Sequence, residues 1–287
     1  MSLIFDHVSY KYDTGKKDEP MVLDDINFQI SDGDFVGIIG HTGSGKSTLA
    51  KHMNGLLLPV SGNIYYNGQD IGDGDYDRVA LRRKVGLVFQ YPEHQLFENT
   101  VIDDVKFGPM NMGLSKVEAE LRAYEAVKLM GIGEDLLDAS PFMLSGGQKR
   151  RVAIAGILAM KPEMLVMDEP TAGLDPAGKE ELYGIITELH EKHNMTVILI
   201  SHAMEEIGRY AKRILVLNAG KVYADGTPKE VFRLEKELKK VGIKIPEVTY
   251  ILNRLKEKGW EFDDTGVTVE EAAGLIYDEW LRRRARK

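Results

Sequence analysis

The nine-residue segment 40–48, with the letters GHTGSGKST, constrains the fold of this chain more than any other stretch. It fits the pattern G-x-x-x-x-G-K-[ST], in which backbone N–H groups wrap around the phosphates of a nucleotide. An apolar run of strand length, residues 35–39, precedes the segment, and residues 49–58 follow it with a helical pattern. Because this motif functions between a strand and a helix, the order predicts an α/β fold built around a phosphate-binding loop.

The residues of this loop have separate predicted roles. The glycines allow tight turns, so that backbone amides and the positive end of the following helix point at anionic oxygens. Lys46 is predicted to reach the β- and γ-phosphates, and the Ser47 hydroxyl to bind Mg²⁺. A glycine-rich turn without phosphate chemistry is the alternative that the loop alone leaves open. The predicted nucleotide-binding residues are Gly40, His41, Thr42, Gly43, Ser44, Gly45, Lys46, Ser47 and Thr48.

Composition narrows the classes of protein to which the chain can belong. Its 287 residues are 43% hydrophobic, enough for one main domain with a sizeable core and a small appendage. The absence of cysteine excludes disulfides, thiolate metal sites and cysteine nucleophiles. The net charge of −8 argues against broad, nonspecific binding of nucleic acid. No apolar run approaches the roughly 20 residues of a membrane-spanning helix, and no leader pattern stands at the N-terminus, so we expect a soluble, cytosolic chain.

Antiparallel strands are predicted on both sides of the phosphate loop. Apolar residues tend to alternate in residues 3–12 and 22–30, which is typical of half-buried strands. After the loop, residues 62–68 have a strand pattern that ends in Asn-Gly, a strong hairpin signal. Tyr12 ends the first of these strands, where it can stack on an adenine ring. Its spacing alone favours an ordinary strand aromatic instead.

The next part of the chain changes from strand to helix. Residues 85–89 are an apolar strand, and Gln90 follows at its carboxyl end, where open α/β sheets place ligands. From residue 92 to about residue 143 strand signals are scarce, and Ser115 with Glu118 forms a capping box. We therefore predict a helical insertion within the α/β domain. The helix after the capping box carries an apolar stripe of Val117, Leu121, Tyr124 and Val127.

A pair of glycines lies at the predicted start of a later helix. Ser145 as N-cap and Gln148 three positions on satisfy exposed amides reciprocally, which gives both residues a structural explanation. The cap does not require Gly146 and Gly147, because glycine in the first turn weakens a helix. Their missing side chains let a group approach the positive end of the helix, and a phosphate fits there.

Two adjacent carboxylates follow the next buried strand. Residues 164–167 have the strand pattern, and Asp168 and Glu169 come directly after it. Adjacent residues on a strand point to opposite faces, so the two have different predicted tasks. Asp168 is predicted to hold Mg²⁺ through its water shell, and Glu169 to polarise the attacking water. A strand-end Asp-Glu pair is common, but after a phosphate loop the pair favours a metal site.

Two further segments complete the set of candidate residues. Asp175 followed by Pro176 has the pattern of an N-cap and a first helical position. Residues 196–200 are another buried strand, which ends in Ser201 and His202. Ser201 is predicted to cap the next helix, whereas His202 is placed to contact a γ-phosphate.

In their order and context, GHTGSGKST, Gln90, LSGGQ, MDEP, AGLD and His202 resemble the motifs of the ATP-binding cassette (ABC) ATPases. The resemblance covers residues 3 to about 228. It implies an α/β P-loop NTPase fold of the ABC ATPase type, with an antiparallel β subdomain. It also implies an inserted helical subdomain at about residues 92–162 and a small C-terminal helical appendage.

The same resemblance implies an ATP site shared between two subunits. Tyr12 is expected to stack on adenine, and Gln90 to contact Mg²⁺ and the attacking water. His202 is expected to orient the γ-phosphate and the water, and Asp175 to communicate across the dimer. Two ATP molecules are then sandwiched head to tail. Each is closed by signature residues of the other subunit, Ser145, Gly146, Gly147 and Gln148.

A narrower resemblance starts at Gln90 with the letters QYPEHQLF and continues to FGPMNMGL at residues 107–114. It is similar to the ATPase subunits of energy-coupling factor (ECF) transporters, which import vitamins and transition metals. Such subunits pair with a second ATPase and act with a transmembrane coupling protein and a substrate-capturing membrane protein. The resemblance implies that the coupling protein contacts the segment from Tyr91 to Phe97. The alternative is that Leu96 and Phe97 merely pack the helical insertion.

The pattern divides the chain into an ATP-binding domain at residues 1–228 and an appendage at residues 229–287. The appendage is too small to be securely stable alone, so it is expected to dock. In the ECF ATPases such an extension helps the subunits stay paired, which implies a dimerisation appendage here. The basic run at residues 282–287 is interpreted as a solvated helix end rather than a site for membrane phosphates.

The predicted function is a Mg²⁺-dependent ATPase subunit that powers an importer from the cytoplasmic face of the membrane. One alternative is a soluble ABC ATPase acting on nucleic acid or ribosomes, which a single cassette without sustained heptads disfavours. A P-loop kinase is another, but it does not explain LSGGQ or Glu169. A non-catalytic nucleotide switch is a further alternative, and only a measurement of ATP hydrolysis distinguishes it from an ATPase. The cargo, and whether the second ATPase is identical or a paralogue, stay open.

Overall fold

A six-stranded sheet carries the phosphate loop in the computed structural model, which describes residues 2–13, 15, 20–262 and 264–286. The strand order is β10-β9-β3-β8-β7-β6, and only β10 runs antiparallel to its neighbour. The central strands are buried along their whole length, as parallel strands covered on both faces must be. The strands are β3 (Phe35–Gly40), β6 (Val85–Val88), β7 (Met164–Asp168), β8 (Thr196–Ile200), β9 (Arg213–Asn218) and β10 (Lys221–Gly226).

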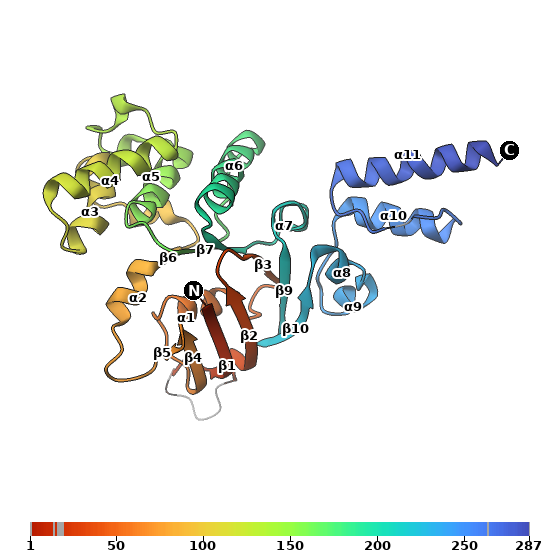
Figure 1. The fold of residues 1–287 in the computed structure, drawn as a ribbon, viewed down its shortest axis with the longest axis horizontal. Helices are drawn as coiled ribbons and strands as arrows, with labels where there is room; N and C mark the ends of the chain where they lie inside the picture. The colour runs from red at the N-terminus through yellow and green to blue at the C-terminus, as the bar shows by residue number, and fades with distance from the viewer. Residues whose placement is uncertain (1, 14, 16–19, 263, 287) are drawn as a thin grey trace.

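A four-stranded antiparallel sheet with the order β2-β1-β4-β5 packs beside it, confirming the predicted β subdomain (Figure 1). Its β4–β5 hairpin turns at Asn67 and Gly68, with φ of 52° and 80°, the paired positive values that an Asn-Gly hairpin turn requires. The strands are β1 (Ser2–Tyr10), β2 (Leu23–Ser31), β4 (Ser61–Tyr66) and β5 (Gln69–Asp70).

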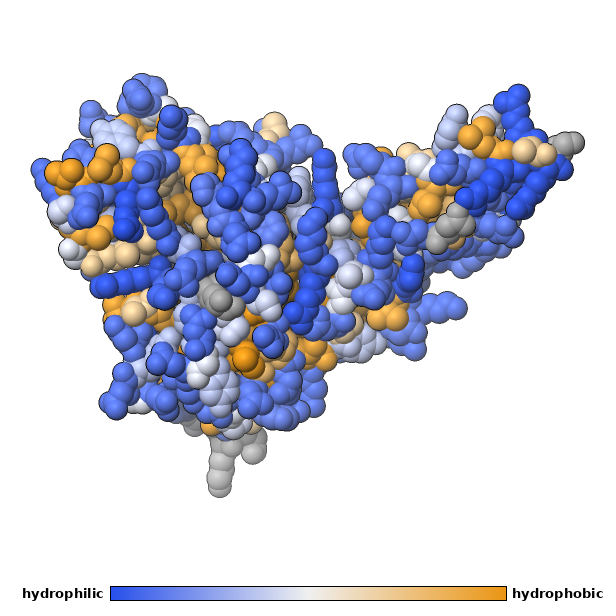
Figure 2. Space-filling model, in the orientation of Figure 1, coloured by the Kyte–Doolittle hydropathy of each residue, from blue (hydrophilic) through white to orange (hydrophobic). Residues whose placement is uncertain are grey.

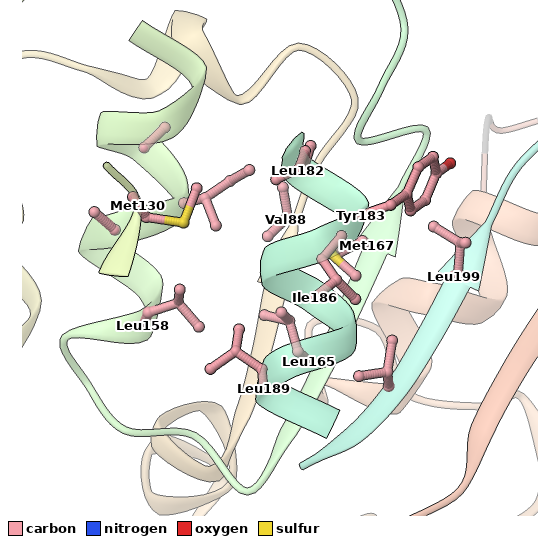
Figure 3. Packing of buried hydrophobic residues seen from close by; sticks show 14 of the residues in the cluster. Val88, Met130, Leu158, Leu165, Met167, Leu182, Tyr183, Ile186, Leu189 and Leu199 are labelled. Carbon is pink, nitrogen blue, oxygen red and sulfur yellow. The ribbon is translucent and has the colours of Figure 1, made fainter. Parts of the chain in front are cut away.

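Alternate residues of the central strands enter two hydrophobic cores. Val166 and Ile198 face a core shared with the antiparallel sheet and helix α1 (Lys46–Met53). Leu165 and Leu199 face the other core, which α6 (Pro176–His193) covers. Figure 3 shows Leu182, Ile186 and Leu189 of α6 packed over Leu165, Met167 and Leu199. The phosphate loop is therefore held at one end of a sheet that is buried on both faces.

The helical insertion lies between β6 and β7 and occupies the upper left of Figure 1. The capping box of Ser115 and Glu118 is present at the start of α4. The elements are a short turn η1 (Pro92–Gln95), α3 (Val101–Asn111), α4 (Lys116–Leu129), the turns η2 (Glu134–Leu136) and η3 (Pro141–Met143), and α5 (Gly146–Leu158). The helix α2 (Arg78–Lys84), which precedes β6, was not predicted.

The predicted apolar stripe on α4 does not face the core. Of its four members only Val127 is buried, whereas Val117, Leu121 and Tyr124 are exposed. The helix instead buries Ala119, Ala123 and Ala126, because small side chains let α4 lie close to α3 and α5. Figure 2 shows apolar surface over this part of the molecule as a result.

The C-terminal helices project from the end of the sheet that carries β9 and β10 (Figure 1). Phe232, Leu238 and Val267 of this region belong to the same core as α6, so the expected docking is observed. The elements are α7 (Met204–Tyr210), α8 (Pro228–Phe232), α9 (Glu235–Lys240), α10 (Glu247–Glu257) and α11 (Val269–Ala285). Among the described residues no helix is both long enough and apolar enough to cross a membrane.

Candidate functional site

The phosphate loop ends at Gly45, which precedes α1 in a left-handed conformation with φ of 106°. Only glycine adopts this φ without strain, and it lets Lys46 begin the helix directly. The Lys46 ammonium donates to the Gly40 carbonyl at 2.8 Å and to the His41 carbonyl at 3.0 Å. Lys46 is only 7% exposed, and this burial lowers the pKa of its ammonium, against the opposing carboxylates of Glu169 and Asp168. The helix thus starts three residues earlier than its apolar pattern indicated, at Lys46 rather than at Leu49.

A pocket of 430 Å³ opens in front of this loop. It brings together residues that are far apart in the sequence, from the loop, the end of β6, the end of β7 and the end of β8. Such strand ends are where parallel sheets place their ligands. The predicted site residues that line it are Thr42, Gly43, Gly45, Lys46, Ser47, Thr48, Gln90, Asp168, Glu169 and His202.

Tyr12 lies beside the loop without lining the pocket. Its hydroxyl shares a hydrogen bond of 3.1 Å with that of Thr48, and its ring meets Tyr10 edge-on at 5.0 Å between centroids. The side chain is partly exposed. Tyr12 is therefore an edge residue of the loop, and its stacking on adenine stays a prediction.

Asp168 and Glu169 differ in backbone conformation at the end of β7. Asp168 is the last residue of β7, whereas Glu169 has a φ of 52° and belongs to the turn that follows. The predicted separation of the two carboxylates therefore arises from this turn rather than from strand alternation. A left-handed glutamate is strained, and the bond from its N–H to the Ile200 carbonyl, 2.9 Å long, holds it in place.

The Glu169 carboxylate lies in surroundings that favour a bound proton. Its Oε1 is buried and has no hydrogen-bond partner among the described residues, and His202 Nε2 lies 3.6 Å away. Burial, followed by the charge of Asp168, raises the pKa of Glu169 to about 7, although Lys46 opposes the shift. A carboxylate with such a pKa accepts a proton from water more readily than an ordinary glutamate.

His202 sits at the pocket, but Ser201 does not cap a helix as predicted. The helix α7 begins at Met204 with Ala203 as its N-cap, and the Ser201 hydroxyl accepts the Ala203 N–H at 3.1 Å. Burial and the nearby Lys46 lower the pKa of His202, which keeps its imidazole neutral near pH 7. A neutral ring can both accept and donate a hydrogen bond.

Three oxygen-bearing side chains in the pocket suit Mg²⁺. They are the hydroxyl of Ser47, the amide of Gln90 and the carboxylate of Asp168. Within the described residues no group of three His, Cys, Asp or Glu side chains forms a metal site. Mg²⁺ takes few protein ligands and completes its shell with water and phosphate oxygens. The donor set therefore fits the predicted metal.

The signature residues lie elsewhere. Ser145 caps α5, accepting the Gln148 N–H at 3.3 Å while the Gln148 side chain accepts the Ser145 N–H at 3.0 Å, so the predicted capping box is present. Asp175 caps α6 by accepting the Gly178 N–H at 3.0 Å. Ser145, Gly147, Gln148 and Asp175 line a second pocket of 320 Å³, and none of them lines the pocket in front of the phosphate loop.

Comparison with known proteins identifies the family of the chain. A family model described as "ABC transporter" matches residues 23–172. The ECF transporter ATP-binding protein EcfA2 of Caldanaerobacter subterraneus subsp. tengcongensis is 53% identical over 272 residues, 95% of each chain. The EcfA2 protein of Clostridioides difficile is 49% identical over 274 residues, again 95% of each chain. The chain belongs to the ECF transporter ATP-binding proteins. It is thus an ABC ATPase that binds ATP and whose hydrolysis of ATP is coupled to transport.

Solved structures resemble this ECF ATPase over most of its length. The structure of CbiO1 from Clostridium perfringens, described as part of the ABC transporter complex CbiONQ, matches with a TM-score of 0.73 and 38% identity. It covers 88% of this chain and 98% of that one. A dimeric ATP-binding cassette, MJ0796, described in a post-hydrolysis state with ADP and Pi, matches with a TM-score of 0.70 and 31% identity over 79% of this chain and 98% of that one.

The sequence did not predict that a charged residue close to the signature residues of this ECF ATPase is buried. Arg150, two residues after the capping Gln148, is buried and paired with Glu93. The signal was present, since Arg150 is spaced by four and eight residues from Ile154 and Leu158 on the buried side of α5. A charged residue on an apolar helix face indicates a specific partner.

Proposed function

We propose that two subunits close around two ATP molecules, each held between the phosphate loop of one subunit and the signature residues of the other. The observation that supports this is the separation of the two pockets. Lys46, Asp168 and Glu169 line one, whereas Ser145 and Gly147 line another. The positive end of α5 lies at the second pocket, so in this proposal a second subunit supplies it to the phosphates that Lys46 holds.

In this proposal the pocket residues divide the chemistry. Lys46 and the loop amides neutralise phosphate charge, and Ser47, Asp168 and Gln90 hold Mg²⁺. When bound, Mg²⁺ stabilises the negative charge that develops on the phosphate oxygens. Glu169 accepts the proton of the attacking water, and the neutral His202 beside it orients that water by hydrogen bonding.

We further propose that a transmembrane coupling protein docks at the segment from Tyr91 to Phe97, on the cytoplasmic face of the membrane. Phe97 is 56% exposed and lies edge-on to Phe107, with ring centroids 4.7 Å apart. Gln95, Leu96 and Phe107 line a groove of 470 Å³ that runs between α2, α3 and α5. Exposed aromatics beside an apolar groove are suited to anchoring a helix of a partner. The transported cargo, a vitamin or a transition metal, would be captured by a further membrane protein.

Replacing Phe97 with alanine is expected to lower the recovery of this coupling protein in detergent pull-downs by about tenfold, because aromatic anchors carry much of the energy of an interface. Val60→Ala is the matched control, since Val60 is also exposed but lies before β4. Equal recovery with both variants would contradict docking at this segment. Cargo uptake by vesicles that contain the complete assembly, measured with and without ATP, tests the whole proposal.

The appendage is proposed to hold the pair together when no nucleotide is bound. The helix α11 exposes Tyr277, Trp280 and Leu281, and Trp280 is 46% exposed. The double change Tyr277→Ser and Trp280→Ser is expected to weaken nucleotide-free pairing about tenfold or more in sedimentation. Val60→Ser is the control for loss of an exposed apolar side chain, and unchanged association of the double variant would refute the proposal. Substitution is preferable to truncation because Phe232 and Leu238 belong to the core.

A further inference from the structure

A buried arginine joins three segments around the candidate site. Arg150 is 4% exposed, and its guanidinium donates to both carboxylate oxygens of Glu93, at 2.9 Å and 3.1 Å. A further nitrogen, Nη1, donates to the Pro170 carbonyl at 3.2 Å and to the Ala172 carbonyl. One side chain therefore makes four hydrogen bonds to residues 57, 20 and 22 positions away in the chain.

Each of these segments has its own place in the proposed function. Glu93 lies in η1, within the segment at which the coupling protein is proposed to dock. Pro170 and Ala172 lie one and three residues after Glu169, in the turn that leads to Asp175. Arg150 itself lies in the first turns of α5, close behind the signature residues. The guanidinium thus contacts the proposed docking segment and the turn after Glu169, and it belongs to the helix that begins at the signature residues.

The chemistry of this contact requires arginine. A guanidinium has five donors in a planar fork, so it can bind a carboxylate with two of them and still reach two carbonyls. A lysine ammonium is a point charge that cannot reproduce this geometry. Burial alone would raise the pKa of Glu93, but the hydrogen bonds and charge of Arg150 outweigh it and hold the pKa below its ordinary range. The pair is therefore ionised, and loss of either partner would leave the other charge buried.

We propose that Arg150 is a positioning residue, which transmits the seating of the coupling protein on η1 to the turn that carries Glu169 and to the signature helix. This inference rests on the docking site proposed above. When a partner helix moves η1, Glu93 pulls the guanidinium, and the guanidinium moves the carbonyls of residues 170 and 172 with it. In this proposal Arg150 acts on hydrolysis through the placement of other groups.

The proposal separates catalysis from nucleotide binding. Arg150→Lys keeps the charge but loses the fork, and Glu93→Gln keeps the shape but loses the charge. In both variants KM for ATP should stay within about twofold, because the loop that holds the phosphates is unchanged. The turnover number should fall by about tenfold or more, since small misplacement of a catalytic group is costly. The turnover number should no longer depend on the coupling protein.

The experiment measures kcat and KM for ATP in two settings, the pair of ATPases alone and the complete assembly in phospholipid vesicles. The readout is the ratio of the two kcat values. Arg213→Met is the matched control, because Arg213 also binds a carboxylate with two nitrogens, that of Asp225, and a backbone carbonyl, that of Gln29. Arg213 lies at the start of β9, at the opposite end of β3 from the phosphate loop. Arg213→Met should keep the wild-type ratio.

The expected result is a ratio near one for Arg150→Lys and Glu93→Gln and a wild-type ratio for Arg213→Met, with each kcat measured per folded molecule below the unfolding transition of every variant. A wild-type ratio in Arg150→Lys would overturn the proposal. So would a loss of kcat that follows the loss of folded protein, because that result means a structural role only. A wild-type ratio that is itself one would instead refute the docking site on which the proposal depends.

Discussion

Replacing Glu169 with glutamine is expected to abolish ATP turnover while leaving ATP-dependent pairing of the subunits intact. The amide has nearly the same shape as the carboxylate but does not accept a proton from water. Loss of a general base typically costs about 10²- to 10⁴-fold in rate. Nucleotide binding should persist because Lys46 and the loop amides are unchanged, and removal of a buried negative charge beside Asp168 favours the bound anion.

Two measurements separate these effects. Phosphate release reports turnover, and sedimentation with and without ATP reports pairing. Glu180→Gln is the control, because Glu180 is an exposed glutamate of α6, outside the pocket. Near-wild-type phosphate release from the Glu169 variant would refute the role of this residue as the base.

An aspartate in place of Gly146 is expected to leave the fold intact and to stop hydrolysis. A side chain at Gly146 meets no atom within 4 Å in this chain, so the protein itself has room for it. An acidic residue at a helix N-terminus even stabilises the helix, by about 0.3–1 kcal/mol. The same carboxylate would occupy and repel the position at which a phosphate of the second subunit is proposed to lie, and kcat should fall by about 100-fold.

The matched control for this change is Gly184→Asp. Gly184 also has open space around it, but it lies on the exposed side of α6. Both variants should melt at or above the wild-type temperature and bind a fluorescent ATP analogue as isolated subunits. ATP-dependent pairing in the Glu169→Gln background should disappear with Gly146→Asp only. If Gly146→Asp paired and hydrolysed ATP normally, the signature helix would have no part in a shared site.

The sequence predicted the parts of the fold that have strong local signals. The buried strands β3, β6, β7 and β8 are short apolar runs between turn signals. The strands β9 and β10 and the helix α2 were not predicted. Alternate residues of β10 are only half-buried, and α2 buries only Leu81. Neither element therefore has a clear apolar period.

The site divides in the same way. Motif residues such as Lys46, Asp168 and His202 meet in one pocket, as their positions at strand ends predicted. Their individual roles stay predictions until the substitutions are made. The left-handed turn at Glu169 has no sequence signal, because glutamate gives no preference for that conformation. The contact of Arg150 with Glu93 joins residues 57 positions apart, which only the packing of α5 on η1 decides.

The helix α7 begins two residues after His202 and also carries the C-terminal region on its other side. A methyl group at Gly208 would lie 3.3 Å from the Val267 carbonyl oxygen and 3.4 Å from the Phe232 ring, so the two parts are in direct contact there. The ATP-binding domain therefore cannot be exchanged independently of the C-terminal helices. A chimaera that takes its last helices from a paralogue has to take α7 from the same parent, or the mismatch will reach the histidine of the pocket.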